Sequence, residues 1–80
     1  NNHVVLCGYG RVGSTVAAYL DHLYIPYVVI ELDPVHISYL QEHGIPCVYG
    51  DIGKNNVLIE AKIEKASILV MAIADPVGIR

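Results

Sequence analysis

The sequence has few basic residues and no long apolar run, and both shortages exclude broad classes of protein. Only 5 residues are Lys or Arg against 8 that are Asp or Glu, so the formal net charge is -3. A general nucleic-acid or anionic-membrane surface needs a basic stripe, which the sequence lacks. No apolar run approaches the ~18 residues of a membrane span, and no signal peptide opens the sequence, so we expect a soluble domain.

Cysteine is also scarce. Cys7 and Cys47 are the only two, and neither belongs to a C-x-x-C pair or a Cys/His cluster. Such isolated cysteines are typical of buried, reduced thiols in a cytosolic protein. We therefore expect neither a zinc site nor any other metal site.

Groups that could perform catalysis are missing as well. A dehydrogenase needs a proton-relay residue near the nicotinamide, normally a His, Lys or Tyr from a second domain. The four histidines, His3, His22, His36 and His43, do not cluster in the sequence, and we expect structural roles for them. The six tyrosines are not interleaved with a series of basic residues, so we expect them to pack rather than to stack on bases. No catalytic residue is predicted.

The sequence does contain a glycine-rich turn, in the stretch from Val4 to Gly13, V-V-L-C-G-Y-G-R-V-G. An apolar strand followed by G-x-G-x-x-G and a helix is the pattern that holds the phosphates of a dinucleotide. Gly8 would reverse the chain tightly, Gly10 would let a pyrophosphate approach the backbone, and Gly13 would let the helix pack on the strand. The free N–H groups at the helix start would then face the phosphates.

Apolar runs and helical periodicity alternate along the whole chain. We expect strands at His3–Cys7, Tyr27–Glu31, Cys47–Tyr49 and Ser67–Ile73, with helices at about 11–24, from Asp33-Pro34 to Gly44, and at about 55–61. Right-handed crossovers then give an α/β fold, a Rossmann-like doubly wound parallel sheet with four strands in the order 3-2-1-4.

Two details of the helices can be predicted from their spacing and ends. The first helix should bury the face formed by Val12, Val16, Leu20 and Leu23. In the second, Asp33 should be the N-cap, Ile37 and Leu40 should be buried, and Gly44 should be the C-terminal cap.

Size and composition suggest a piece of a larger protein. Eighty residues make at most one domain of marginal stability, yet 54% are hydrophobic and only 16% are charged. In the order 3-2-1-4 the fourth strand lies at an edge, and proteins usually cover or charge an apolar edge. We therefore expect the sheet to continue into at least one more strand, or a partner chain to cover this edge.

Acidic and basic residues stand at the expected carboxyl edge of the sheet. Glu31 lies 18 positions beyond Gly13, close to the offset at which an acid accepts hydrogen bonds from an adenosine ribose and repels a 2′-phosphate. Asp33 is either a second ribose contact or only the helix cap. Asp51 either accepts the adenine amino group or caps the next helix. Arg11, in the glycine turn, could hold a phosphate.

Four segments together resemble a known family. C-G-Y-G-R-V-G, Y-V-V-I-E-L-D-P, V-Y-G-D and L-V-M-A-I-A-D-P, in this order, resemble the nucleotide-binding half of the RCK domain, also called the KTN or Trk-type N-terminal (TrkA-N) domain. The likeness is greatest to the version attached to Kef-type potassium/proton antiporters, and residues 1–80 would be a partial domain of this kind.

The resemblance implies a cytoplasmic regulatory module on the inner face of the membrane. It would bind NAD(H), or alternatively AMP, ADP or ATP, gate the transmembrane domain of a potassium channel or antiporter, and form a homodimer or higher oligomer. The implied nucleotide-binding residues are Gly8, Tyr9, Gly10, Arg11, Val12, Gly13, Glu31, Asp33, Gly50, Asp51, Ile52 and Ala72.

The sequence departs from the family pattern at two places, and other function classes stay open. Ile52-Gly53 follows the Gly-Asp pair where a small residue is usual, and Lys62 stands where a glycine is usual near the end of the third helix. The fold alone would equally suit the cofactor half of an NAD-dependent oxidoreductase. A methyltransferase, which also uses a glycine-rich turn and an acid after the second strand, is a weaker alternative.

Overall fold

A parallel four-stranded sheet forms the frame of the protein in the computed structural model, which describes residues 2–73. The strands are β1 (His3–Cys7), β2 (Tyr27–Glu31), β3 (Cys47–Tyr49) and β4 (Ala66–Met71). Their order is β3-β2-β1-β4, with every neighbouring pair parallel. The predicted strand order is therefore confirmed.

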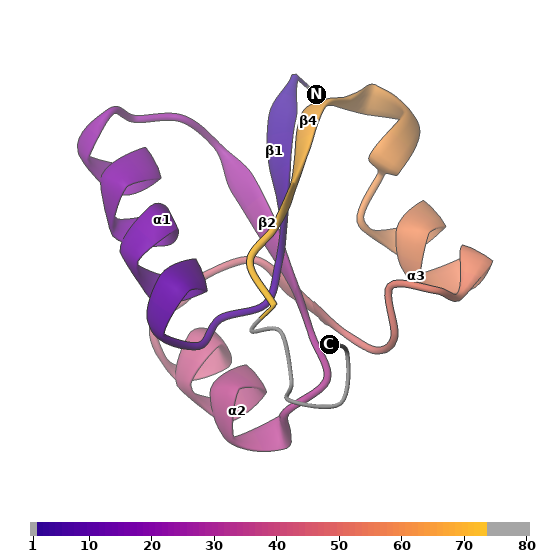
Figure 1. The fold of residues 1–80 in the computed structure, drawn as a ribbon, viewed down its shortest axis with the longest axis horizontal. Helices are drawn as coiled ribbons and strands as arrows, with labels where there is room; N and C mark the ends of the chain where they lie inside the picture. Colours follow the sequence, from indigo (N-terminus) through magenta and orange to yellow (C-terminus); the bar gives the residue numbers. More distant parts are fainter. Residues whose placement is uncertain (1, 74–80) are drawn as a thin grey trace, which may run out of the picture.

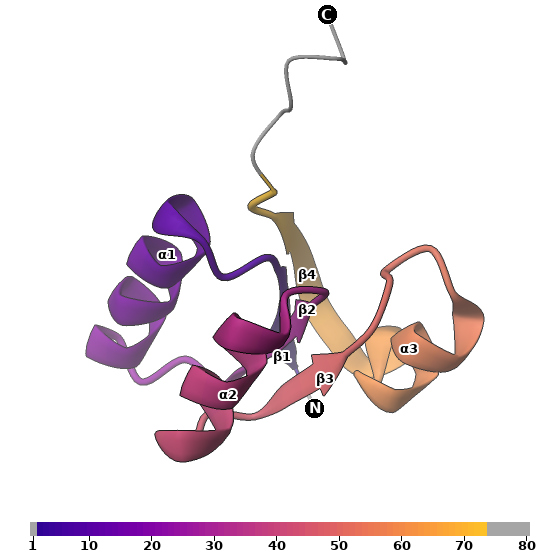
Figure 2. The same cartoon turned by 90° about the horizontal axis from the view of Figure 1, so that it is seen from below.

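Helices cover both faces of this sheet. They are α1 (Arg11–His22), α2 (Pro34–Glu42) and α3 (Asn55–Glu60), and a 3₁₀ turn at Ile63–Lys65 leads into β4. Figure 2 shows α1 and α2 together on one face and α3 on the other. This arrangement confirms the Rossmann-like, doubly wound α/β fold.

The core consists of two clusters separated by the sheet. Alternate side chains of a strand point to opposite faces, so Val4 and Leu6 of β1 pack toward α1 and α2, whereas Val5 packs toward α3. Every residue of β1 is buried as a result. This complete burial fixes the end of β1, from which the glycine turn departs.

The buried face of α1 differs from the predicted one. Gly13, Ala17 and Leu20 are buried, whereas Val12 is 57% exposed and Leu23 is 47% exposed. Leu20 was therefore predicted correctly, and Val12 and Leu23 wrongly. The reason is that the close approach of α1 to the end of β1 at Gly13 sets the contact stripe along Gly13, Ala17 and Leu20, and Val12 and Leu23 lie outside this stripe.

The predicted ends of α2 are confirmed. The Asp33 carboxylate accepts a hydrogen bond from the backbone N–H of Val35 at 2.9 Å, as an N-cap does. Gly44 follows the helix with φ of +68°, the left-handed conformation that favours glycine at this point. Ile37 and Leu40 are buried as predicted.

Strand β4 lies at the edge of the sheet, as predicted. It pairs with β1 along one side (Figure 1), and Ile68, Leu69 and Met71 are exposed, as is Ile73 just beyond it. The strand covers residues 66–71 rather than the predicted 67–73. That a further strand or a partner chain covers this edge stays a prediction.

Lys62 offers a test of backbone strain at the end of α3. It has φ of 58° and ψ of 49°, a left-handed conformation that is unfavourable for any residue with a Cβ. We expect Lys62→Gly to raise the free energy of unfolding, measured in urea, by about 0.5 to 1 kcal/mol. Lys62→Ala removes the same side chain but keeps the strain, so it should change stability little. Equal effects of the two substitutions would contradict this explanation.

Candidate functional site

The carboxyl ends of the strands meet at one edge of the sheet. The backbone N–H of Gly8 donates to the carbonyl of Ile30 at 2.9 Å, that of Gly50 donates to Glu31 at 3.0 Å, and that of Ala72 donates to Cys7 at 2.8 Å. These bonds hold the turns after all four strands side by side. In a doubly wound sheet this is the edge at which nucleotides bind.

The glycine turn has the close packing that the sequence predicts for two of its three glycines. Gly8 has φ of +103°, and a Cβ on it would lie 2.9 Å from the carbonyl oxygen of Ala72. A Cβ on Gly13 would lie 2.0 Å from the carbonyl oxygen of Gly8, which no side chain tolerates. Both glycines are therefore required for the fold.

Gly10 differs from these two glycines. A Cβ added to Gly10 would meet nothing within 4 Å, so the fold itself leaves this position open. Gly10 is also the N-cap of α1 and provides no side chain to cap the first helical N–H groups. Uncapped N–H groups at a helix start, together with the helix dipole, favour a phosphate at this place.

The Glu31 carboxylate is the most constrained polar group of this edge. Its side chain is only 10% exposed, and it accepts hydrogen bonds from the N–H groups of Tyr9 and Asp33, both at 2.7 Å. Nδ1 of His36 lies 3.1 Å from Oε1 of the same carboxylate. Burial by itself raises the pKa of Glu31, but the hydrogen bonds from Asp33, Tyr9 and His36 outweigh it and lower the pKa below its ordinary value. The side chain is therefore an anion at neutral pH.

His36 is a residue of this site that the sequence did not indicate. It follows the Asp33 N-cap by one helical turn, and its ring meets that of Tyr9 edge to face with centroids 6.4 Å apart. Its position in the sequence could have indicated this place, because the first turn of a helix that starts at the carboxyl edge must lie close to the acid at the end of β2. These contacts agree with the structural role expected for His36, and they also place it at the candidate site.

Two cavities adjoin Glu31 and bring the predicted residues together. One, of about 360 Å³, is lined by Cys7, Gly8, Ile30, Glu31, Leu32, Asp33, Gly50, Asp51, Ile52 and Ile73. The other, of about 460 Å³, is lined by Gly10, Arg11, Val12, Glu31, Asp33, His36, Ala72 and Ile73. Of the twelve predicted site residues, only Tyr9 and Gly13 line neither cavity. Tyr9 acts through its backbone N–H on Glu31, and Gly13 through packing.

A larger cavity, of about 580 Å³, lies at the opposite end of the sheet. It is lined by Asp21, Tyr24, Ile25, Pro26, Tyr27, His43, Gly44, Ile45 and Pro46, which surround the amino ends of β2 and β3. Size alone would favour it, but it has neither the glycine turn nor an uncapped helix start. The carboxyl edge is the better candidate because ligands of open α/β sheets bind there.

The alternative that Asp51 caps the next helix is wrong. Its Oδ1 accepts a hydrogen bond from the N–H of Gly53 at 2.8 Å, within the loop. The N-cap of α3 is instead Lys54, which makes no side-chain cap. The turn is tight here as well, because a Cβ on Gly50 would lie 2.5 Å from a methyl carbon of Val57. Asp51 thus stays exposed on the rim of the smaller cavity.

Arg11 begins α1 with an exposed side chain. Within residues 2–73, no carboxylate lies at ion-pair distance from its guanidinium group. A cation at the positive end of a helix is unfavourable unless an anion joins it. Its place on the rim of the cavity that contains Gly10 therefore suits a phosphate contact.

Other groups of the described region are unremarkable. Cys7 is buried and Cys47 partly so, and both are free thiols; burial, with the nearby Glu31 and Asp51, raises the pKa of Cys7. Over residues 2–73, no group of three His, Cys, Asp or Glu side chains could hold a metal ion. None of the helices in this part of the chain has the length and apolarity to cross a membrane.

Comparison with known proteins identifies the family. The family model described as the TrkA-N domain matches residues 4–78. Potassium channel protein 1 of Methanocaldococcus jannaschii is 36% identical over 76 residues, which are 92% of this chain and 23% of that protein. The glutathione-regulated potassium-efflux system protein KefC of Cronobacter sakazakii is 36% identical over 73 residues, which are 91% of this chain and 12% of that protein. The chain thus spans less than a quarter of either relative.

Solved structures agree with this assignment. The TrkA-N domain of the inner membrane protein ybaL from Escherichia coli is 38% identical with a TM-score of 0.87, over 90% of this chain and 53% of that one. The Kef CTD of Shewanella denitrificans in its AMP-bound form is 26% identical with a TM-score of 0.71, over 94% of this chain and 44% of that one. Of the L-V-M-A-I-A-D-P segment, residues 74–76 lie outside the described residues. The match over nearly the whole chain, together with the shared fold, shows that this chain belongs to the TrkA-N domain family.

Proposed function

We propose that this chain is the cytoplasmic, nucleotide-binding part of a potassium channel or potassium/proton antiporter, and that its role is regulatory rather than enzymatic. Binding of the nucleotide would favour one of two states of the assembly and so couple this site to the transmembrane domain. The assembly would be a homodimer or a higher oligomer at the inner face of the membrane. In this reading residues 1–80 are part of a larger domain.

One observation carries the proposal: a nine-tenths buried, ionised carboxylate, Glu31, lies beside an uncapped helix start. The two groups suit two adjacent parts of a 5′-nucleotide, its ribose and its phosphate. The carboxylate accepts a ribose hydroxyl, and the first turn of α1 with Arg11 faces the phosphate. The Kef CTD of Shewanella denitrificans, a relative by fold, is known in an AMP-bound form, which supports an adenine nucleotide as the ligand.

The ligand is proposed to be AMP, ADP, ATP or NAD(H). Asp51 and Ile52, on the rim of the smaller cavity, would lie beside the adenine. Glu31 would repel a 2′-phosphate, so NADPH should bind more weakly than NADH. Calorimetric titrations with AMP, ATP, NAD, NADH, NADPH and S-adenosylmethionine test the proposal. Binding of the methyl donor alone, or a preference for NADPH, would contradict it.

Gly10→Ala tests the phosphate contact. Because nothing lies within 4 Å of the added methyl group, stability should change little, whereas a bound phosphate would be displaced. We expect at least about a tenfold loss of affinity, or roughly 1.4 kcal/mol. Gly44→Ala is the converse control: its φ of +68° predicts lost stability, and its place away from the carboxyl edge predicts unchanged affinity. Unaltered nucleotide affinity in Gly10→Ala would argue against a phosphate at this turn.

A further inference from the structure

The Glu31 carboxylate is already engaged on both oxygens by the protein itself. Oε1 receives the N–H of Tyr9 at 2.7 Å and Nδ1 of His36 at 3.1 Å, and Oε2 receives the N–H of Asp33 at 2.7 Å. Each carboxylate oxygen accepts about two hydrogen bonds. Within residues 2–73, these three donors fill both acceptor positions of Oε1 and one of the two positions of Oε2, so one position of Oε2 stays open. Glu31 can therefore accept one further hydroxyl, although a ribose presents two.

The state of His36 follows from its partner. Glu31 is ionised and acceptor-only, so Nδ1 must carry the proton that it donates. In the neutral ring the other nitrogen, Nε2, is then an acceptor. His36 also lines the cavity that contains Gly10 and Arg11, with its side chain 35% exposed. A second hydroxyl acceptor thus stands directly beside Glu31.

The ring has supports that keep it in this position. It packs edge to face on Tyr9, and Tyr9 in turn lies 5.8 Å, centroid to centroid, from Tyr39 one turn further along α2. Oδ2 of Asp33 lies 3.9 Å from Nδ1, so both nearby carboxylates attract the proton-bearing side of the ring. A ribose would have to break these contacts to take the place of His36 on Oε1.

We propose that His36 is a specificity-determining residue that shares the ribose with Glu31, Glu31 accepting one hydroxyl through Oε2 and His36 accepting the other through Nε2. This inference rests on the proposed function, since it concerns the same nucleotide site. It makes the site selective for ribonucleotides over both kinds of deoxynucleotide. The two hydroxyls also differ in strength, because a hydrogen bond to a charged acceptor is worth more than one to a neutral ring.

The test is calorimetric titration of the full chain at pH 8 with AMP, 2′-deoxy-AMP and 3′-deoxy-AMP. In the wild type, loss of the hydroxyl on Glu31 should weaken binding roughly ten- to a hundredfold, and loss of the one on His36 about three- to tenfold. Each loss is expressed as the ratio of the dissociation constant of the deoxynucleotide to that of AMP. In His36→Leu the smaller of these two ratios should fall to about one. The larger ratio should persist. His36→Gln, whose amide keeps an acceptor, should restore part of the smaller ratio.

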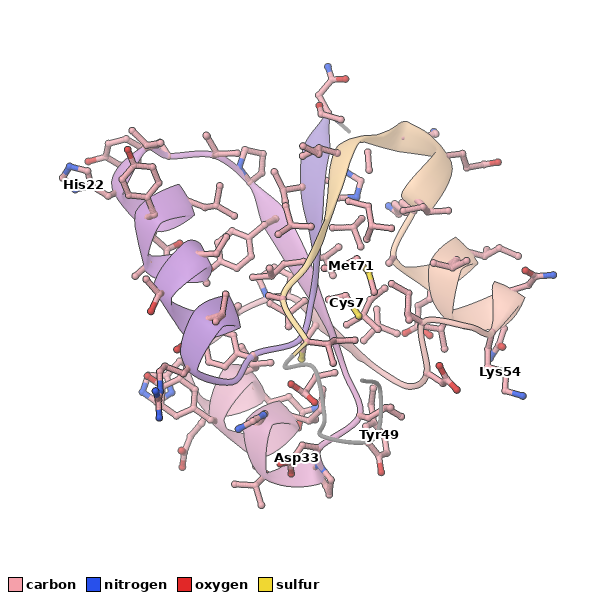
Figure 3. All side chains as sticks on the ribbon, in the orientation of Figure 1. Cys7, His22, Asp33, Tyr49, Lys54 and Met71 are labelled. Atoms are coloured by element: carbon pink, nitrogen blue, oxygen red, sulfur yellow. The ribbon has the colours of Figure 1, made fainter. Side chains whose placement is uncertain are left out.

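A matched control is His22→Leu, the same substitution at the exposed end of α1. Figure 3 shows His22 at the opposite end of the molecule from Asp33, so both ratios should stay at their wild-type values. Three results would overturn the inference: both ratios unchanged in His36→Leu, tighter AMP binding in that variant because His36 merely competed for Oε1, or a Gln variant no better than Leu. If the wild type binds none of the adenine nucleotides, the proposed function fails first and the role of His36 with it.

Discussion

Replacing Gly13 by alanine is expected to lower the free energy of unfolding by at least about 3 kcal/mol. The added Cβ would lie 2.0 Å from the carbonyl oxygen and 2.6 Å from the carbonyl carbon of Gly8. Both atoms belong to the backbone of the turn, so no side chain can rotate away to relieve the contact. Helix α1 would have to move off β1, and the buried contacts of Ala17 and Leu20 would loosen with it.

The sign of this effect separates packing from helix propensity. Alanine is favoured over glycine inside a helix by up to about 1 kcal/mol, so propensity alone predicts that Gly13→Ala stabilises the protein. Gly10→Ala, three residues earlier and with nothing within 4 Å, is the matched control for urea unfolding followed by circular dichroism. If the two variants unfold at the same urea concentration, close packing of α1 on the turn is not what requires Gly13.

The topology could be predicted from the sequence because each strand and helix has its own local signal. Apolar runs of five residues or so, separated by helical patterns and by Asp33-Pro34 or Gly44, leave few ways to arrange a parallel sheet. The handedness of the crossovers then gives the order β3-β2-β1-β4. No tertiary information is needed for this step, since chain connectivity supplies it.

The errors arose where one element's contacts depend on another element. The count of apolar residues predicts Val12 and Leu23 on the buried face of α1, yet the close approach at Gly13 puts Gly13, Ala17 and Leu20 on that face instead. Helix capping was one of the two roles left open for Asp51, and it is excluded because the loop of Asp51 turns before α3 begins. Periodicity shows that a helix has a buried face; only packing decides which one.

His36 shows the same limit at the site. Glu31 could be predicted from its offset to the glycine turn, but the three partners that hold its carboxylate come from two separate segments, the glycine turn with Tyr9 and the start of α2 with Asp33 and His36. Two of these are backbone N–H groups, which leave no mark in the sequence. The position of an acid can therefore be predicted from the sequence more readily than its protonation and its remaining acceptor capacity.

Glu31→Gln is expected to weaken both the fold and nucleotide binding. Glutamine has a single oxygen and places an NH₂ group where the second carboxylate oxygen stood, so at least one of the N–H groups of Tyr9 and Asp33 would face a donor. An unsatisfied buried donor costs about 1 to 3 kcal/mol, and we expect a loss of stability of this size at pH 7. AMP affinity should fall at least about tenfold, because the hydroxyl loses a charged acceptor.

The pH dependence provides an independent check. The folded-state pKa of Glu31 lies below its ordinary value of 4.5, so the ionised carboxylate stabilises the protein above that pH, and this stabilisation is lost as the pH falls through the folded-state pKa. The stability difference between wild type and Glu31→Gln should therefore be full at pH 7 and shrink below about pH 4.

Asp33→Asn is the control for stability. It also removes one negative charge, but asparagine is an N-cap of equal quality, and the side chain of Asp33 is 49% exposed. A difference for Glu31→Gln that is constant from pH 7 to pH 3 would mean that its hydrogen bonds do not depend on ionisation, and would remove the basis for treating this carboxylate as the anionic anchor of the site.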